Sequence, residues 1–163
     1  MRTFNTILIS GGAGFIGSNM IRYLLAGNSG FTGRIINVDL LTYAGNGESL
    51  ADIEARFGAG LEPRYIFVQG DICDRPLVER LFSDYAVDTV VHFAAESHVD
   101  RSILGPEAFI RTNVLGTYTL LDVARTNWQA RYASLREAPV LFHHISTDEV
   151  YGSLGETGYF TET

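Results

Sequence analysis

The side chains best able to do chemistry in this sequence come in one short run. Ser146 and Thr147 precede Asp148 and Glu149, directly after an apolar run that ends at Ile145. Two adjacent carboxyl groups in different surroundings can divide into a neutral acid and an ionised base. An elimination of water needs such a pair, because one group protonates the leaving hydroxyl while the other removes a proton. The same residue types also cap helices, and the spacing alone favours a cap.

A second group consists of glycines at G-x-x-G-x-x-G spacing, namely Gly11, Gly14 and Gly17. In a strand–turn–helix unit, the first glycine permits a tight turn, the second lets the backbone approach a pyrophosphate, and the third lets helix and strand pack closely. The helix N-terminus offers its free N–H groups to the phosphates. An ordinary tight turn would also use glycine. The apolar run before the glycines and the helical pattern after them favour dinucleotide binding.

Two aspartates follow later apolar runs. Asp39 lies 22 residues after Gly17, close to the spacing of an acidic residue that accepts hydrogen bonds from ribose hydroxyls. A carboxylate there repels a 2′-phosphate, so the sequence favours NAD over NADP. The alternative is that Asp39 only caps a loop. Asp71 could meet an adenine amino group, or it could be a turn or helix cap.

The polar run 95–101 and two histidines are less informative. The run follows another apolar segment and could line a sugar or nicotinamide pocket, or form a solvated loop. His143 and His144 are neighbours in an apolar run, and neighbours in a strand face opposite ways. We therefore interpret both as structural and expect no metal site.

These residues need a scaffold of alternating strands and helices. The patterns predict strands at 6–10, 34–38, 65–68, 88–94 and 140–145, and helices at 15–26, 49–57, 76–85 and 108–127. Such alternation implies parallel pairing with right-handed crossovers. We expect an α/β fold with a doubly wound parallel sheet (Rossmann) in the order 3-2-1-4-5. Ligands bind beyond the carboxyl ends of such strands, where all the residues above lie.

Composition limits the class of protein. A chain of 163 residues is one domain's worth, and its net charge of −7 argues against binding to nucleic acid or anionic membranes. One cysteine rules out an internal disulfide and fits a reducing compartment. Neither a run of 18 apolar residues nor a signal peptide is visible, so we expect a cytoplasmic protein.

The motifs match a known family. The chain resembles the extended short-chain dehydrogenases/reductases, and among them the dTDP-glucose 4,6-dehydratases. The resemblance covers nearly all of the sequence. The segments that carry it are 11–19 (GGAGFIGSN), Asp39 with 41–46 (LTYAGN), 70–72 (GDI), 92–102 (HFAAESHVDRS), 113–117 (NVLGT) and 146–152 (STDEVYG).

The resemblance implies roles for these residues. In this family NAD oxidises C4 of a nucleotide-diphosphoglucose, water is eliminated across C5 and C6, and the hydride returns to C6. Thr147 would position the C4 hydroxyl, Asp148 would be the acid at C6 and Glu149 the base at C5. The implied NAD site comprises Gly11, Gly14, Phe15, Ile16, Gly17, Asp39, Asp71, Ile72, Ala94, Ala95 and Ser97. A homodimer is also implied.

One departure from the family concerns a Tyr-x-x-x-Lys pair that assists the oxidation. The sequence contains no lysine. We therefore expect residues 1–163 to be the NAD-binding, N-terminal portion of a longer enzyme, truncated before that pair and before the sugar-nucleotide domain, and unable to complete the reaction alone. The alternatives are a related NAD-dependent nucleotide-sugar epimerase and a non-catalytic NAD-binding module.

Overall fold

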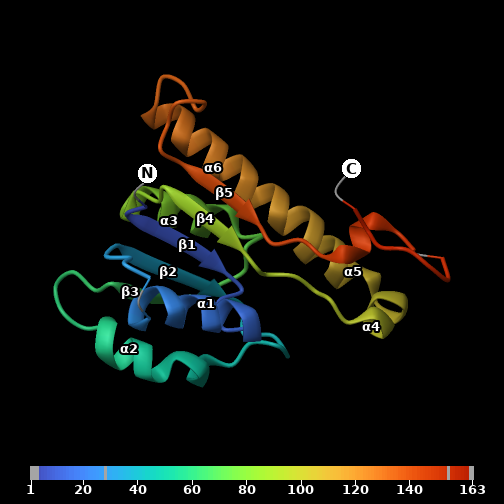
Figure 1. Ribbon diagram of the computed structural model, residues 1–163. Coiled ribbons are helices and arrows are strands. Elements are labelled where there is room, and N and C mark those ends of the chain that lie inside the picture. Colours follow the sequence, from blue (N-terminus) through green and yellow to red (C-terminus); the bar gives the residue numbers. More distant parts are fainter. Residues whose placement is uncertain (1–3, 28, 154, 162–163) are drawn as a thin grey trace.

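The computed structural model describes residues 4–27, 29–153 and 155–161. Its centre is a parallel five-stranded sheet in the order β3-β2-β1-β4-β5 (Figure 1). This confirms the predicted order, and each predicted strand end agrees within two residues. The strands are β1 (Thr6–Ser10), β2 (Arg34–Asp39), β3 (Tyr65–Gln69), β4 (Thr89–His92) and β5 (Leu141–His144).

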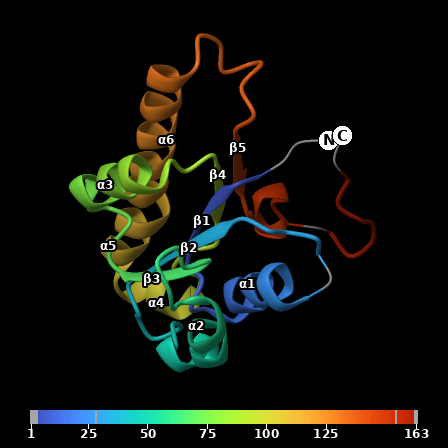
Figure 2. The same ribbon diagram turned by 90° about the vertical axis from the view of Figure 1, so that its left-hand side faces the viewer.

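Helices cover both faces of the sheet, as Figure 2 shows. One face carries α1 (Phe15–Ala26) and α2 (Ala51–Phe57), and the other carries α3 (Arg75–Tyr85) and α6 (Thr117–Arg131). Alternate residues of β1 therefore enter different cores: Ile7 and Ile9 pack on the α1 side, and Leu8 packs on the α3 side. Burial on both faces explains why the strands are apolar along their length.

The region between β4 and β5 differs from the prediction. The expected helix at 108–127 is divided into α5 (Pro106–Phe109), a π-helical segment (Ile110–Gly116) and α6. A further helix, α4 (Val99–Leu104), occupies part of the polar run that was expected to be a loop or pocket lining. The apolar spacing of 108–127 predicts only a continuous helix, because a π-turn changes the backbone hydrogen bonding without interrupting the helix.

Two buried side chains fasten the sheet at the end opposite to the strands' carboxyl ends. Asp88 Oδ2 accepts hydrogen bonds from the backbone N–H groups of Asn5 (2.9 Å) and Thr6 (3.3 Å), which joins the start of β1 to β4. The indole N–H of Trp128 donates to the carbonyl oxygen of Val87 at 2.9 Å, which anchors α6 to the same place. The Asp88 contacts hold β1 and β4 in register, and the Trp128 contact fixes α6 against the start of β4.

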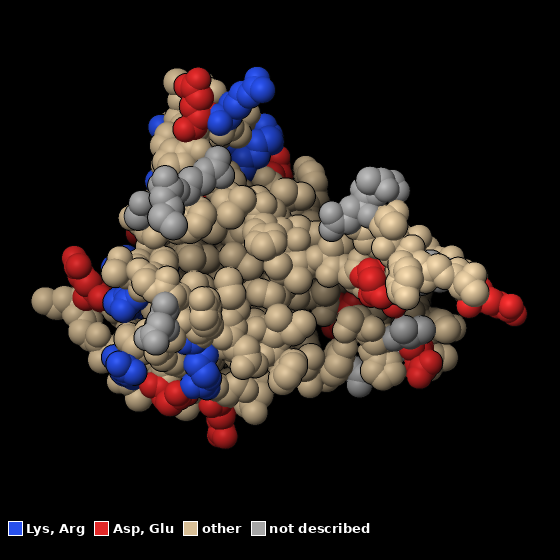
Figure 3. Space-filling model, in the orientation of Figure 1, with Lys and Arg blue, Asp and Glu red and all other residues tan. Residues whose placement is uncertain are grey.

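Charged side chains lie at the margins of the face in Figure 3, and its middle carries none. Acidic and basic groups are interspersed along the lower and upper margins of this face. Within the described residues, no helix is long and apolar enough to cross a membrane. The same residues contain no group of three or more side chains placed to hold a metal ion.

Candidate functional site

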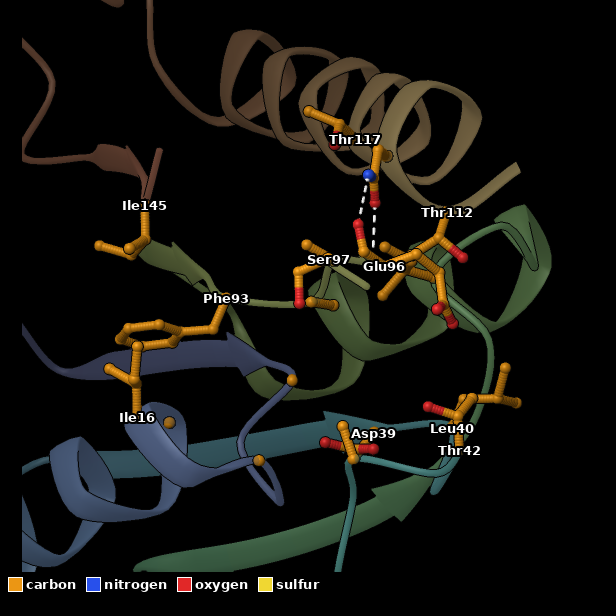
Figure 4. A pocket seen from close by; sticks show the side chains of 18 of the residues that line it. Ile16, Asp39, Leu40, Thr42, Phe93, Glu96, Ser97, Thr112, Thr117 and Ile145 are labelled. Carbon is orange, nitrogen blue, oxygen red and sulfur yellow. Dashed lines mark hydrogen bonds between the residues drawn. The ribbon is translucent and has the colours of Figure 1, made fainter. Parts of the chain in front are cut away.

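A cleft of about 650 Å³ opens where the strands end at their carboxyl side. This volume is typical of a small-molecule or cofactor site. Segments that follow all five strands contribute to its walls (Figure 4). All eleven predicted cofactor residues line it: Gly11, Gly14, Phe15, Ile16, Gly17, Asp39, Asp71, Ile72, Ala94, Ala95 and Ser97. Their role in binding remains a prediction.

The glycine loop forms the floor of the cleft between β1 and α1. Gly11 has a φ of +74°, and a Cβ there would lie 2.6 Å from the backbone nitrogen of Ala94. A Cβ on Gly17 would lie 2.4 Å from the carbonyl oxygen of Gly11. Only glycine fits either position. Gly14 precedes α1 without a side chain to cap it, so the first N–H groups of the helix lack a side-chain partner from this position.

Asp39 ties this loop to the end of β2. Its buried carboxylate accepts hydrogen bonds from the backbone N–H groups of Ala13 (2.9 Å, at Oδ2) and Leu41 (2.8 Å, at Oδ1). Asp39 therefore does cap a loop, as the alternative interpretation predicts. The same carboxylate also lines the cleft, so capping a loop and facing a ligand are compatible here.

Asp71 is likewise both a turn residue and a wall of the cleft. Its Oδ1 accepts from the backbone N–H of Cys73, and its Oδ2 accepts from Arg111 Nη2, each at 2.8 Å. Burial raises the pKa of Asp71, but the hydrogen bonds from Cys73 and Arg111 outweigh it and leave this pKa below its usual value. Burial and the neighbouring carboxylate raise the pKa of the Cys73 thiol to about 11, so that thiol stays protonated.

A side-chain clamp holds the segment after β4. The Asn113 amide donates to the carbonyl oxygen of Glu96 and accepts from the backbone N–H of Glu96, both at 2.8 Å (Figure 4, dashed lines). Asn113 belongs to the π-helical segment, which therefore sets the course of the chain past Ala94, Ala95 and Ser97.

The acidic run after β5 contributes side chains to the wall of the cleft. Ser146, Thr147 and Glu149 line it, whereas Asp148 begins a 3₁₀ turn (Asp148–Tyr151). The Thr147 hydroxyl donates to Asp148 Oδ1 (3.3 Å) and accepts from the backbone N–H of Glu149 (3.4 Å). Thr147 thus caps the turn and faces the cleft at once, so the helix-cap interpretation does not remove Thr147 or Glu149 from the site. Asp148 is exposed and is not among the residues that line the cleft.

Other lining residues were not predicted from the sequence. They come from the loop after β2, from the π-helical segment and α6, and from β5: Leu40, Thr42, Ala44, Gly45, Thr112, Asn113, Thr117 and His144. The segment 41–46 was noted for its resemblance but not assigned to the site. Asn113 and Thr117 belong to the segment 113–117 that carries the resemblance, but neither it nor Thr112 is assigned to the site, because a helical pattern does not show which side of the helix faces a ligand. His144 was interpreted as structural.

Comparisons with known proteins agree with this geometry. A family model described as GDP-mannose 4,6 dehydratase matches residues 8–163. A dTDP-glucose 4,6-dehydratase of Escherichia coli K12 is 51% identical over 148 residues, which are 91% of this chain and 38% of that protein. The resemblance to dTDP-glucose 4,6-dehydratases is therefore confirmed.

Solved structures show the same relationship. A dTDP-glucose 4,6-dehydratase from Streptomyces venezuelae, solved with NAD, is 46% identical with a TM-score of 0.76 over 94% of this chain and 43% of that chain. A UDP-Glc/GlcNAc 4-epimerase from Campylobacter jejuni is 28% identical, with a TM-score of 0.77 over 98% and 42%.

This chain spans about two fifths of the length of these relatives. Because the family model matches all but the first seven residues, the chain belongs to the GDP-mannose 4,6 dehydratase family.

Proposed function

We propose that this chain forms the cofactor-binding part of an NAD-dependent nucleotide-diphosphoglucose 4,6-dehydratase that acts on dTDP-glucose. The observation that carries the proposal is a single cleft in which the glycine loop and Asp39 meet the 146–149 run. The dTDP-glucose 4,6-dehydratase of Escherichia coli K12, 51% identical, supports the reaction class. The NAD held by the Streptomyces venezuelae structure supports the cofactor.

The residues of the cleft fit a dinucleotide. Gly14 lines the cleft, and a Cβ there would already lie 3.3 Å from the Gly11 carbonyl oxygen, a tight contact, so the bare backbone leaves room for a phosphate group that a side chain would narrow. The uncapped N-terminus of α1 would donate its N–H groups to that phosphate. A carboxylate has about four lone-pair sites, and Asp39 uses two of them, which leaves two for the adenosine ribose hydroxyls. Bound NAD would supply the hydride acceptor for C4 of the sugar.

The 146–149 run would perform the elimination. Thr147 would orient the C4 hydroxyl, since its side chain lines the cleft. Glu149 would take the proton from C5, and Asp148, hydrogen bonded to Thr147, would protonate the C6 hydroxyl. The C6–O bond then breaks and water leaves, so one proton is removed and one is delivered.

A nucleotide-sugar epimerase is the second candidate, because an epimerase structure superposes on this chain with a TM-score of 0.77. The two dehydratases are 46–51% identical to this chain, whereas the epimerase is 28% identical to it. An epimerase also has no elimination step, and so it does not need the Asp148 and Glu149 pair.

We also propose that the chain forms a homodimer through the π-helical segment and α6. Large apolar side chains recur at helical spacing along this surface and are 46–61% exposed: Ile110, Val114, Tyr118 and Leu121. An exposed apolar stripe of this kind is typical of an interaction surface.

NAD binding by the 163-residue chain, measured by calorimetry, tests the cofactor assignment. We expect Gly14→Ala to weaken NAD binding by about tenfold or more, because its methyl group occupies the space for the phosphate. Gly47→Ala is the matched control, since a Cβ at Gly47 meets only Leu41 at 3.7 Å and lies outside the cleft. Equal binding by the two variants, or stronger binding of NADP than NAD by the unchanged chain, contradicts the assignment.

The elimination is tested by measuring dTDP-glucose dehydration with the natural protein and its variants. Glu149→Gln is expected to retain NAD and to lose dTDP-glucose dehydration by about a hundredfold or more, because the base is gone. Full dehydration by this variant would show that Glu149 is not the base. Epimerisation without dehydration by the unchanged protein would favour the epimerase, and the absence of both reactions would favour the non-catalytic alternative.

A further inference from the structure

A buried histidine joins the sheet to the wall of the cleft. His92, at the end of β4, is 1% exposed. Its Nδ1 lies 2.6 Å from Ser10 Oγ, and its Nε2 lies 2.9 Å from Thr117 Oγ1. Ser10 is fully buried at the end of β1, whereas Thr117 lines the cleft. The three side chains thus form one hydrogen-bonded chain from the sheet to the ligand site.

The donors and acceptors available to these three side chains decide the direction in which each hydrogen bond is donated. In the described part of the protein, His92 is the only hydrogen-bond partner of the Ser10 hydroxyl. A fully buried hydroxyl must donate its proton or lose the free energy of that hydrogen bond. Ser10 therefore donates to Nδ1, and a neutral imidazole then carries its proton on Nε2. The Nε2–H donates to Thr117 Oγ1, so the Thr117 hydroxyl proton points away from His92.

The surroundings keep His92 neutral. Burial, and to a smaller extent His144, whose ring centre lies 5.2 Å away, lower the pKa of His92 to about 4. The other ring packed on it, Phe142, carries no charge. The hydrogen bonds from Ser10 to His92 and from His92 to Thr117 therefore keep this donor direction at neutral pH.

Thr117 and Asp39 lie on opposite sides of the cleft, as Figure 4 shows. Asp39 follows β2, the glycine loop follows β1, and Thr117 is joined to the end of β4. A dinucleotide with its adenosine at Asp39 and its phosphates at Gly14 would place its second nucleoside on the Thr117 side.

We propose that the Ser10–His92–Thr117 chain sets the Thr117 hydroxyl as a hydrogen-bond donor to an acceptor oxygen on the nicotinamide half of bound NAD, with His92 as a positioning residue. This inference rests on the proposed function, because it needs NAD in the cleft. A threonine whose proton were donated to His92 would instead present only lone pairs to the ligand.

The first measurement is the tautomer of His92 in the ligand-free chain. A two-bond 1H–15N correlation spectrum separates the two neutral tautomers, and His92→Gln assigns the signal among the four histidines. We expect the Nε2–H form. The Nδ1–H form would overturn the proposal whether or not NAD binds.

The second measurement is NAD affinity in matched variants. We expect Thr117→Val to weaken NAD binding about fivefold, and Thr117→Ser to stay within about twofold, since serine restores the donor. Thr119→Val is the control, because the Thr119 hydroxyl donates to the Leu115 carbonyl within the helix, and its side chain does not line the cleft.

The outcomes separate this inference from the proposed function. If the unchanged chain binds NAD and Thr117→Val binds it equally well, the donor role of Thr117 is wrong and the proposed function stands. If the unchanged chain binds no NAD, the proposed function fails, and the ligand assigned to Thr117 fails with it.

Discussion

Individual residues in this site serve the fold and the ligand with the same atoms. Asp39 accepts two backbone hydrogen bonds that shape the glycine loop and the loop after β2, and it faces the cleft with the lone pairs that remain. Thr147 caps a 3₁₀ turn with the oxygen that would also orient a substrate. A capping interpretation and a binding interpretation of one residue are therefore not exclusive.

The buried imidazole of His92 predicts a pH dependence of stability. Its pKa is lowered from 6.5 to about 4 in the folded state, so the unfolded chain binds the proton more tightly. The contribution of neutral His92 to the free energy of unfolding should therefore be complete above pH 6.5. It should be lost as the pH drops toward 4, which lowers the free energy of unfolding by up to about 3 kcal/mol.

Urea unfolding at a series of pH values checks this prediction. His92→Gln should flatten the slope between pH 4 and 6.5, whereas His144→Gln should keep most of it, because burial is the larger cause of the lowered His92 pKa and His144 the smaller. An unchanged slope in His92→Gln would mean that other groups cause the dependence.

At the scale of elements, the sequence predicted most of the scaffold. Strand positions and the glycine turn follow from period, β-branched runs and glycine spacing, which are local signals, and the strand order follows from the rule for doubly wound sheets. The π-helical segment and α4 do not follow from them. Their effect on the site comes from tertiary contacts such as the Asn113 clamp on Glu96, which joins residues 17 positions apart.

The register of the sheet depends on Asp88, and this gives a second prediction. Asp88→Ala removes the acceptor of the buried Thr6 N–H and of the more exposed Asn5 N–H, and should lower the free energy of unfolding by about 2–3 kcal/mol. The exposed Asp84→Ala should change it by less than about 0.5 kcal/mol. Similar midpoints for both variants in urea unfolding would argue against this role.

For the whole molecule, the exposed apolar stripe on the π-helical segment and α6 matters most. The opposite face of each helix packs on the sheet through residues such as Leu120 and Val123, so the stripe is not needed for the core. In a two-fold symmetric dimer one such stripe would meet its own copy.

Tyr118→Glu should therefore raise the dimer dissociation constant about tenfold or more without loss of folding stability. Tyr23→Glu, on α1, is the matched control, because Tyr23 and Tyr118 are 59% and 58% exposed. Sedimentation velocity at several concentrations measures both variants. A monomeric unchanged chain, or equal dissociation of the two variants, would show that this surface is not the interface.

The anchoring of α6 by Trp128 has a practical consequence. Trp128 is the only tryptophan in the sequence, and its indole is 5% exposed, packs near Phe82 and donates to Val87. It lies 11 residues beyond Thr117 on a continuous helix, or about 16 Å from the cleft along the axis. Its fluorescence emission therefore reports, from one known place in the core, when α6 separates from the sheet.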